Sequence, residues 1–179
     1  MPKERMPVEL VKELFSYKKT TGELIWRVAP KWGVKIGDRA GTAHTDEKGY
    51  VSRQVGYKRK IYIASHLIWV LMTGEWPKYS IDHKNNDALD DRWENLREAN
   101  QTQQMRNTRK RRTNTSGYKG VYCQAGRTHK DGKNYRWQAM VNGKKVHSPE
   151  RYLTAKEAYE AYCAKLPELH GEFANDGST

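Results

Sequence analysis

The chain has 179 residues, with 33 Lys and Arg against 21 Asp and Glu, which gives a formal net charge of +12. This length allows one domain of average size or two small ones. The surplus of positive charge indicates a polyanionic partner, although composition alone does not separate nucleic-acid binding from an ordinary basic surface.

Composition also limits where the chain acts. Apolar residues make up 36%, but six Trp and eleven Tyr argue against wholesale disorder. The longest apolar run, residues 61–72, is far shorter than the ~20 residues that span a bilayer, so we expect no membrane segment. The N-terminus lacks the pattern of a signal peptide, and Cys123 and Cys163 are distant from each other. We therefore expect a cytoplasmic protein.

The N-terminal half predicts a helix, a β-rich region and a second helix. Apolar residues at helical spacing predict an amphipathic helix over residues 8–17. Residues 22–64 contain four short β-like runs between Gly-containing turns, which predict a small antiparallel sheet or meander. Ser65 is expected to cap a helix that Gly74 ends, and Ile81 to lead a short strand.

The C-terminal half predicts a polar helix, a linker and a second compact unit. The helix covers residues 100–112, with Asn100 as its N-cap, and residues 113–117 have the composition of a linker. Three β-like runs follow, at residues 117–124, 135–141 and 146–153, with an Asn-Gly turn at 142–143. Thr154 and Glu157 form a capping box for a last helix. The expected fold class is therefore α+β.

The stretch IDHKNNDALDDRWENLREANQTQQMRN, residues 81–107, is too polar to fill a core. On a strand, the adjacent Asp82 and His83 point to opposite faces. Asp is a hard oxygen ligand that suits magnesium, and a neutral imidazole can remove a proton from water. Phosphodiester hydrolysis needs both functions. A turn in which the Asp and Asn side chains cap the backbone is the alternative for an isolated DHKNND.

Residues 66–107 resemble the HNH (His-Me finger, ββα-metal) endonucleases, and especially the homing type encoded by phages and introns. The motifs that carry the resemblance are Asp82-His83 at the end of a strand and the WENLREA segment that follows at the family's spacing. The resemblance implies a ββα fold around one divalent ion, Mg²⁺ with Mn²⁺ as a substitute. It also implies that Asp82 is the first metal ligand, that His83 is the general base, and that Asn95 holds the loop and orients the base.

The position of the second metal ligand departs from the family pattern. The family usually has Asn or His nine residues after the asparagine of Glu-Asn-Leu, and here that position is Gln104. A glutamine carbonyl can still bind a cation, but misplacement by about 1 Å can cost on the order of 100-fold in rate. Asn100 and Asn107 are secondary candidates. His66, His44, His129, His147 and His170 are expected to be structural or surface residues.

A run of basic residues follows the motif. A charge run is usually a solvated helix face, but here it lies directly after a candidate phosphodiesterase site, so contact with DNA phosphates is the favoured interpretation. The residues in question are Arg106, Arg109, Lys110, Arg111 and Arg112.

Residues 115–175 resemble the plant ethylene-response-factor (APETALA-type) DNA-binding domain, which also occurs in phage HNH nucleases. The motifs are SGYKGVY, YRWQAMVNGKKVH and the final helical segment. The resemblance implies a three-stranded sheet that binds the major groove, with one helix packed behind it. By position, the DNA-contacting residues would be Lys119, Tyr122, Arg136, Trp137, Lys144 and Lys145. Trp137 could equally be a core residue, and HSPERYL departs from the family, where Pro149 suggests a bulge.

These features together predict an endonuclease of two domains. We expect a nuclease domain over residues 1–112 with its ββα core at 80–110, a linker at 113–117, and an APETALA-type domain over 118–179. The predicted function is magnesium-dependent hydrolysis of duplex DNA by a monomer in the cytoplasm of a bacterial host. The alternative from another class is a DNA-binding protein that has lost catalysis because of Gln104. RNA binding is disfavoured, since the sheet lacks an exposed aromatic pair that stacks bases.

Overall fold

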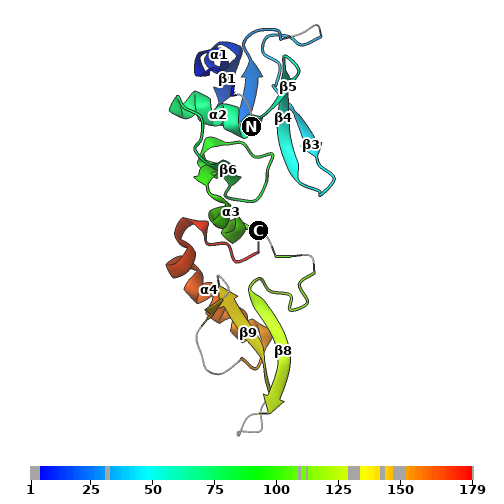
Figure 1. Ribbon diagram of the computed structural model, residues 1–179, viewed down its shortest axis with the longest axis vertical. Coiled ribbons are helices and arrows are strands. Elements are labelled where there is room, and N and C mark those ends of the chain that lie inside the picture. The colour runs from blue at the N-terminus through cyan, green and yellow to red at the C-terminus, as the bar shows by residue number, and fades with distance from the viewer. Residues whose placement is uncertain are drawn as a thin grey trace. The chain divides into compact units, whose positions relative to one another are not determined.

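The computed structural model describes residues 5–30, 33–108, 110–111, 113–128, 134–141, 144–146 and 152–178; at 124–128, 134–136 and 144–145 it describes the backbone alone. The chain divides into two compact units, Met1–Gln101 and Thr102–Thr179. The first unit contains α1 (Val8–Leu14), β1 (Phe15–Lys18), β2 (Glu23–Trp26), β3 (Thr42–Thr45), β4 (Val51–Tyr57), β5 (Lys60–Ile63), α2 (Ala64–Thr73), β6 (Ser80–His83), η1 (Trp93–Asn95) and β7 (Leu96–Ala99). The helix α3 (Gln101–Asn107) begins at the boundary, and β8 (Val121–Thr128), β9 (Asn134–Val141), β10 (Lys144–Lys145), α4 (Ala155–His170) and η2 (Gly171–Phe173) follow in the second unit (Figure 1).

The first helix is shorter than the sequence pattern predicted. It ends at Leu14, and the chain continues as β1, which pairs antiparallel with β2. Phe15 lies opposite Trp26 in this pair, and their ring centroids are 4.5 Å apart. The cross-strand aromatic contact and the β preference of Phe and Tyr explain why the helix stops before residue 15.

Three of the four β-like runs predicted to form one sheet or meander make the three-stranded sheet β3-β4-β5, whereas the first run is β2 and pairs with β1 in a separate sheet. The helix α2 follows β5 directly and packs its apolar side, including Leu67, Ile68 and Val70, into the core of the first unit. Gly74 ends this helix in the left-handed conformation, as predicted. Ser65 does not cap it, because the helix already begins at Ala64 and the Ser65 side chain is buried within its first turn.

The strands β6 and β7 form the antiparallel pair that carries the Asp-His motif. Their register places Asp82 opposite Arg97 and His83 opposite Leu96. The polar helix predicted over residues 100–112 is α3, which ends earlier, at Asn107. The predicted order of strand, loop, strand and helix is therefore present between Ser80 and Asn107.

The second unit is a three-stranded antiparallel sheet in the order β10-β9-β8, with α4 packed on the β8–β9 pair (Figure 1). The predicted capping box is present: the Thr154 side chain accepts from the Glu157 backbone N–H, and the Glu157 side chain accepts from the Thr154 backbone N–H. The third strand was predicted over residues 146–153, whereas β10 lies just before that run at Lys144–Lys145, and an isolated bridge joins Tyr152 to Trp137. Residues 147–151 lie outside the described part of the chain. The bulge expected at Pro149 lies outside the described residues.

The molecule is thus α+β, as its sequence predicted. Each unit has an apolar core of its own: that of the first contains Val11, Leu24 and Leu67, and that of the second contains Val121 and Tyr162. Within the described residues, no helix has both the length and the apolar character needed to cross a membrane.

Candidate active site

Asp82 and His83 are the last two residues of β6, and each has a charged neighbour. Asp82 Oδ2 accepts a hydrogen bond from Arg97 Nε at 2.9 Å, and both side chains are largely buried, with 13% and 9% exposed. The register of β6 and β7 produces this pair, because Arg97 is the cross-strand partner of Asp82. The carboxylate is therefore held in position by Arg97 before any cation binds.

The His83 side chain is oriented by Asp91. Its Nε2 lies 3.1 Å from Asp91 Oδ1, and the Asp91 side chain is 1% exposed. A carboxylate can only accept, so Nε2 carries the proton in this contact and the basic nitrogen of the neutral ring is Nδ1. A histidine that a buried carboxylate orients in this way is suited to general-base chemistry.

Asp91 is itself held by two parts of the first unit that are distant in the sequence, the β1–β2 hairpin and the strand β4. Its Oδ2 lies 3.4 Å from Arg53 Nε on β4, an ion pair without hydrogen-bond alignment. Its backbone carbonyl accepts from the Tyr17 hydroxyl on β1 at 2.9 Å. Gly22, in the β1–β2 turn, approaches so closely that a Cβ there would lie 2.7 Å from Arg92 N and 2.9 Å from Asp91 C. The hairpin and the meander together position the carboxylate.

Asn95 braces the loop between β6 and η1. Its Oδ1 accepts from the Asn85 backbone N–H at 3.0 Å, and its Nδ2 donates to Asn85 Oδ1 at 2.9 Å and to the Asp90 carbonyl at 2.7 Å. The residue is 6% exposed. A buried amide with three such bonds holds both ends of the loop that begins at His83.

A second acidic residue, Asp90, stabilises the same loop from its outer side. Its carboxylate accepts from Arg92 Nε and Nη2 at 2.8 and 2.7 Å and from Asn85 Nδ2 at 2.8 Å. These bonds, above all those from Arg92, lower the pKa of Asp90 to about 2. The two adjacent carboxylates therefore have different contacts: Asp90 closes the loop, and Asp91 faces His83.

His66, near the start of α2, lies close enough to His83 for their charges to interact. Burial, followed by the nearby Arg5 and then His83, lowers the pKa of His66. The ring is therefore neutral at pH 7, and it adds no positive charge beside His83. This agrees with the packing role that the sequence suggested for it.

The proposed second ligand, Gln104, lies half-buried on α3. Of the two secondary candidates, Asn107 is buried and its Oδ1 accepts from Asn175 Nδ2 at 3.3 Å, a contact within the second unit. No group of three or more His, Cys, Asp or Glu side chains arranged for a metal occurs within the described part of the chain. Magnesium is usually bound through only one or two protein carboxylates together with water and substrate phosphates, so Asp82 does not need a cluster of acids to take part in such a site.

The predicted DNA-binding residues are placed unevenly. Lys119 Nζ donates to the carbonyls of Arg106 and Asn175, at 2.9 and 2.8 Å, and Lys110 Nζ donates to the Gly117 carbonyl at 2.8 Å. Tyr122 is 52% exposed, whereas Trp137 is partly buried against the core, the packing role left open by the sequence. Arg109 and Arg112 lie outside the described residues, and for Arg136, Lys144 and Lys145 only the backbone is described.

Three functional candidates were not found from the sequence: Asp91, Arg53 and Arg97. For Asp91 the sequence offered one signal, the repeated acid at residues 90–91 inside the polar motif. Arg53 gave none, because its contact with Asp91 depends on how β4 packs against a loop 38 positions further along the chain.

The comparisons with known proteins match the same part of the chain. The family model described as HNH endonuclease matches residues 62–106, which include β6, η1, β7 and most of α3, so these residues form an HNH endonuclease domain. Protein 3.8 of Escherichia phage T7 is 32% identical to the chain over 108 residues, which are 60% of this chain and 84% of that protein. The chain therefore belongs to the HNH endonuclease family. No solved structure matches it significantly.

Proposed function

We propose that the chain is a magnesium-dependent endonuclease of the homing type that hydrolyses phosphodiester bonds in duplex DNA. The observation that carries this proposal is the His83–Asp91 contact at 3.1 Å, directly after Asp82 and inside a loop that Asn95 closes. The membership of the HNH endonuclease family supports the reaction class, and the net charge of +12 supports a polyanionic substrate.

His83 is the general base in this proposal. Its Nδ1 removes a proton from the attacking water, while Asp91 accepts from Nε2 and stabilises the imidazolium that forms. Asn95 keeps the loop, and with it the ring, in position. A base of this kind contributes roughly 10²- to 10⁴-fold in rate.

Asp82 and Gln104 would hold the divalent ion, Mg²⁺ or Mn²⁺ in its place. The donor chemistry fits, because a carboxylate and an amide carbonyl supply hard oxygen ligands. When bound, the ion neutralises charge on the phosphate and on the leaving 3′ oxygen. Arg97 keeps the Asp82 carboxylate aligned through the contact at 2.9 Å.

Nicking of a supercoiled plasmid tests the proposal. With Mg²⁺ the natural chain should convert supercoiled to open-circular DNA, EDTA should stop the reaction, and His83→Ala should lose at least ~100-fold in rate while DNA affinity stays close to that of the natural chain. His44→Ala is the matched control, because His44 is an exposed histidine on β3 of the same unit and contacts Gln54 instead of the loop. Cleavage by His83→Ala at the natural rate would contradict the role of His83.

The second candidate function is DNA binding without catalysis, and Gln104 is the observation that favours it. The longer side chain moves the carbonyl oxygen relative to the Asn usual in the family. Gln104→Asn separates the two functions: cleavage that appears only in this variant supports the binding protein, and cleavage by the natural chain excludes it.

In either case we propose that the C-terminal unit is an APETALA-type DNA-binding module and that the chain acts as a monomer.

A further inference from the structure

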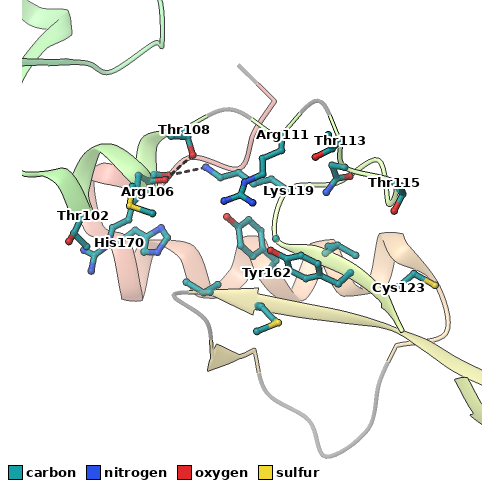
Figure 2. A pocket seen from close by; sticks show the side chains of 17 residues that line it. Thr102, Arg106, Thr108, Arg111, Thr113, Thr115, Lys119, Cys123, Tyr162 and His170 are labelled. Atoms are coloured by element: carbon teal, nitrogen blue, oxygen red, sulfur yellow. Dashed lines mark hydrogen bonds between the residues drawn. The ribbon is translucent and has the colours of Figure 1, made fainter. Parts of the chain in front are cut away.

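A pocket of about 500 Å³ lies within the second unit, between the end of α3, the segment that follows it, β8 and α4. This volume is in the range of ordinary ligand sites. Figure 2 shows that the side chain of Arg111 reaches toward Tyr162, that Lys119 runs beside it toward Arg106, and that His170 lies next to Arg106. The residues that match the HNH family and those that line the pocket overlap only on α3.

The charge of the pocket is of one sign. Its lining includes Arg106, Arg111, Lys119 and His170, and it contains no Asp or Glu among the residues that the structure describes. Burial lowers the pKa of Lys119 to about 8, and burial together with Arg106 and Lys119 lowers the pKa of His170. An anion placed among these groups would replace the solvation that burial removes.

The two arginines have donors to offer. Arg106 Nε is buried and has no hydrogen-bond partner within the described residues, and neither guanidinium forms an ion pair there. Buried donors of native proteins are usually paired, so an unpaired guanidinium Nε that lines a pocket indicates a missing acceptor. Lys119 differs, since two carbonyl groups already accept from its ammonium and fix it at the pocket floor.

The rest of the lining suits a nucleotide. The hydroxyl groups of Thr102, Thr113 and Thr115 add short neutral donors around the arginines, and the exposed side chains of Met105 and Tyr122 add apolar and aromatic surface. Guanidinium groups bind phosphate oxygens in a fixed fork geometry. The one nearby acid that affects Lys119, Asp176, raises the pKa of Lys119 and is not part of the pocket lining.

We propose that this pocket binds the phosphate group of a nucleotide, with Arg106 and Arg111 as its principal ligands. The source we favour is the backbone of a DNA strand, which rests on the proposed function. A free nucleotide offers the same chemistry. The pocket would then seat one phosphate of the substrate at a fixed place in the second unit, and it would do so independently of the major-groove contacts expected from the sheet.

The test measures binding by the full chain in EDTA, so that cleavage does not enter. Removing both charges by Arg106→Gln with Arg111→Gln should weaken the affinity for a fluorescent duplex at least tenfold and reduce the slope of log K against log[salt] by about 0.9, the value for one phosphate contact. Arg111→Gln alone should weaken binding severalfold, and because Arg111 is exposed this variant will fold. Lys156→Gln is the matched control, since Lys156 lies on the exposed side of α4, with 76% of its side chain exposed.

A second arm titrates AMP and inorganic phosphate and follows the Arg106 Nε–H resonance by NMR. Shifts in the natural chain that are lost in Arg111→Gln, which keeps Arg106, with weaker DNA binding, support a phosphate pocket used by DNA. The same loss with unchanged DNA affinity supports the pocket and assigns it to a free nucleotide. No shift and no change in DNA affinity would overturn the inference. If the arginine variants bind DNA more weakly but the natural chain does not nick plasmid DNA in Mg²⁺, the pocket is supported and the nuclease proposal is overturned.

Discussion

At the scale of single residues, the candidate site depends on a carboxylate that does not touch the substrate in our proposal. Asp91 acts through His83, so it is a positioning residue. Asp91→Asn keeps the size of the side chain but offers an N–H as well as a carbonyl to the ring, so the tautomer with basic Nδ1 is no longer fixed. We expect the nicking rate to fall by ~10-fold or more, while DNA affinity is unchanged.

The control for Asp91→Asn is the same change one residue earlier. Asp90→Asn weakens the loop through Arg92 and Asn85 but removes no contact from His83, so its effect on the rate should be smaller. Loss of Asp91 also leaves Arg53 without its ion-pair partner and should lower the free energy of unfolding by on the order of 3 kcal/mol. If Asp91 had a purely structural role, Asp91→Asn would also lower the residual nicking rate of a chain that already carries His83→Ala. Equal residual rates for His83→Ala and the double variant would support action through the ring.

Asp90 also gives the site a dependence on acid. Its folded-state pKa of about 2 is lower than the ordinary value of 3.8, so the unfolded chain binds a proton first as the pH falls. The stabilisation from Asp90 is complete above pH 4 and decreases between about pH 4 and pH 2. The difference in unfolding free energy between the natural chain and Asp90→Asn, measured in urea at about pH 6 and pH 3, should therefore shrink at the lower pH. A constant difference would contradict the Arg92 contact.

At the scale of elements, the turn between β1 and β2 is part of the site architecture. Gly22 has φ +75°, and a Cβ there would collide with the backbone of Asp91 and Arg92. Gly22→Ala should therefore lower both stability and the nicking rate, because the loop must move away together with Asp91. The measurement pairs urea unfolding with plasmid nicking at a temperature where the variant is folded.

Gly49→Ala separates backbone strain from collision. Gly49 has a similar φ, +83°, but a Cβ there meets nothing within 4 Å. This variant should lose about 1 kcal/mol of stability from the left-handed backbone and keep its nicking rate. If Gly22→Ala and Gly49→Ala had the same nicking rate, the turn would have no part in positioning Asp91.

The elements themselves followed from the sequence better than the contacts between them. The motif strands, the meander, the C-terminal sheet and the Thr154 capping box were predicted from local patterns. The end of α1 was not, because the contact between Phe15 and Trp26 that stops the helix is made across a hairpin. The pairing of Asp82 with Arg97 depends on the register of β6 and β7, because a slip of one residue would turn the side chains of one strand to the other face of the sheet. The support of Asp91 depends on packing between segments far apart in the chain, which spacing within a motif does not encode.

At the scale of the whole molecule, each unit has a core built only from its own residues. The core of the first unit runs from Met6 to Leu96, and that of the second from Val121 to Leu166. Such a chain need not unfold in one cooperative step. We expect calorimetry to show two transitions, each of which responds to substitutions in one unit only.

Two substitutions assign the transitions. Leu67→Ala opens a cavity in the first core, which typically costs 2–5 kcal/mol, and should lower only one transition temperature. Gly120→Ala places a Cβ against the Tyr162 ring at φ +71° and should lower only the other, whereas Gly117→Ala, with φ +81° and open space, should lower it far less. Because the phosphate of a nucleotide would bind in the second unit by our inference, AMP should raise the Gly120-sensitive transition and leave the Leu67-sensitive one in place. A single transition that all three substitutions shift together would show that the two cores unfold as one, and the separate action of the pocket and the nuclease site would then lose its thermodynamic basis.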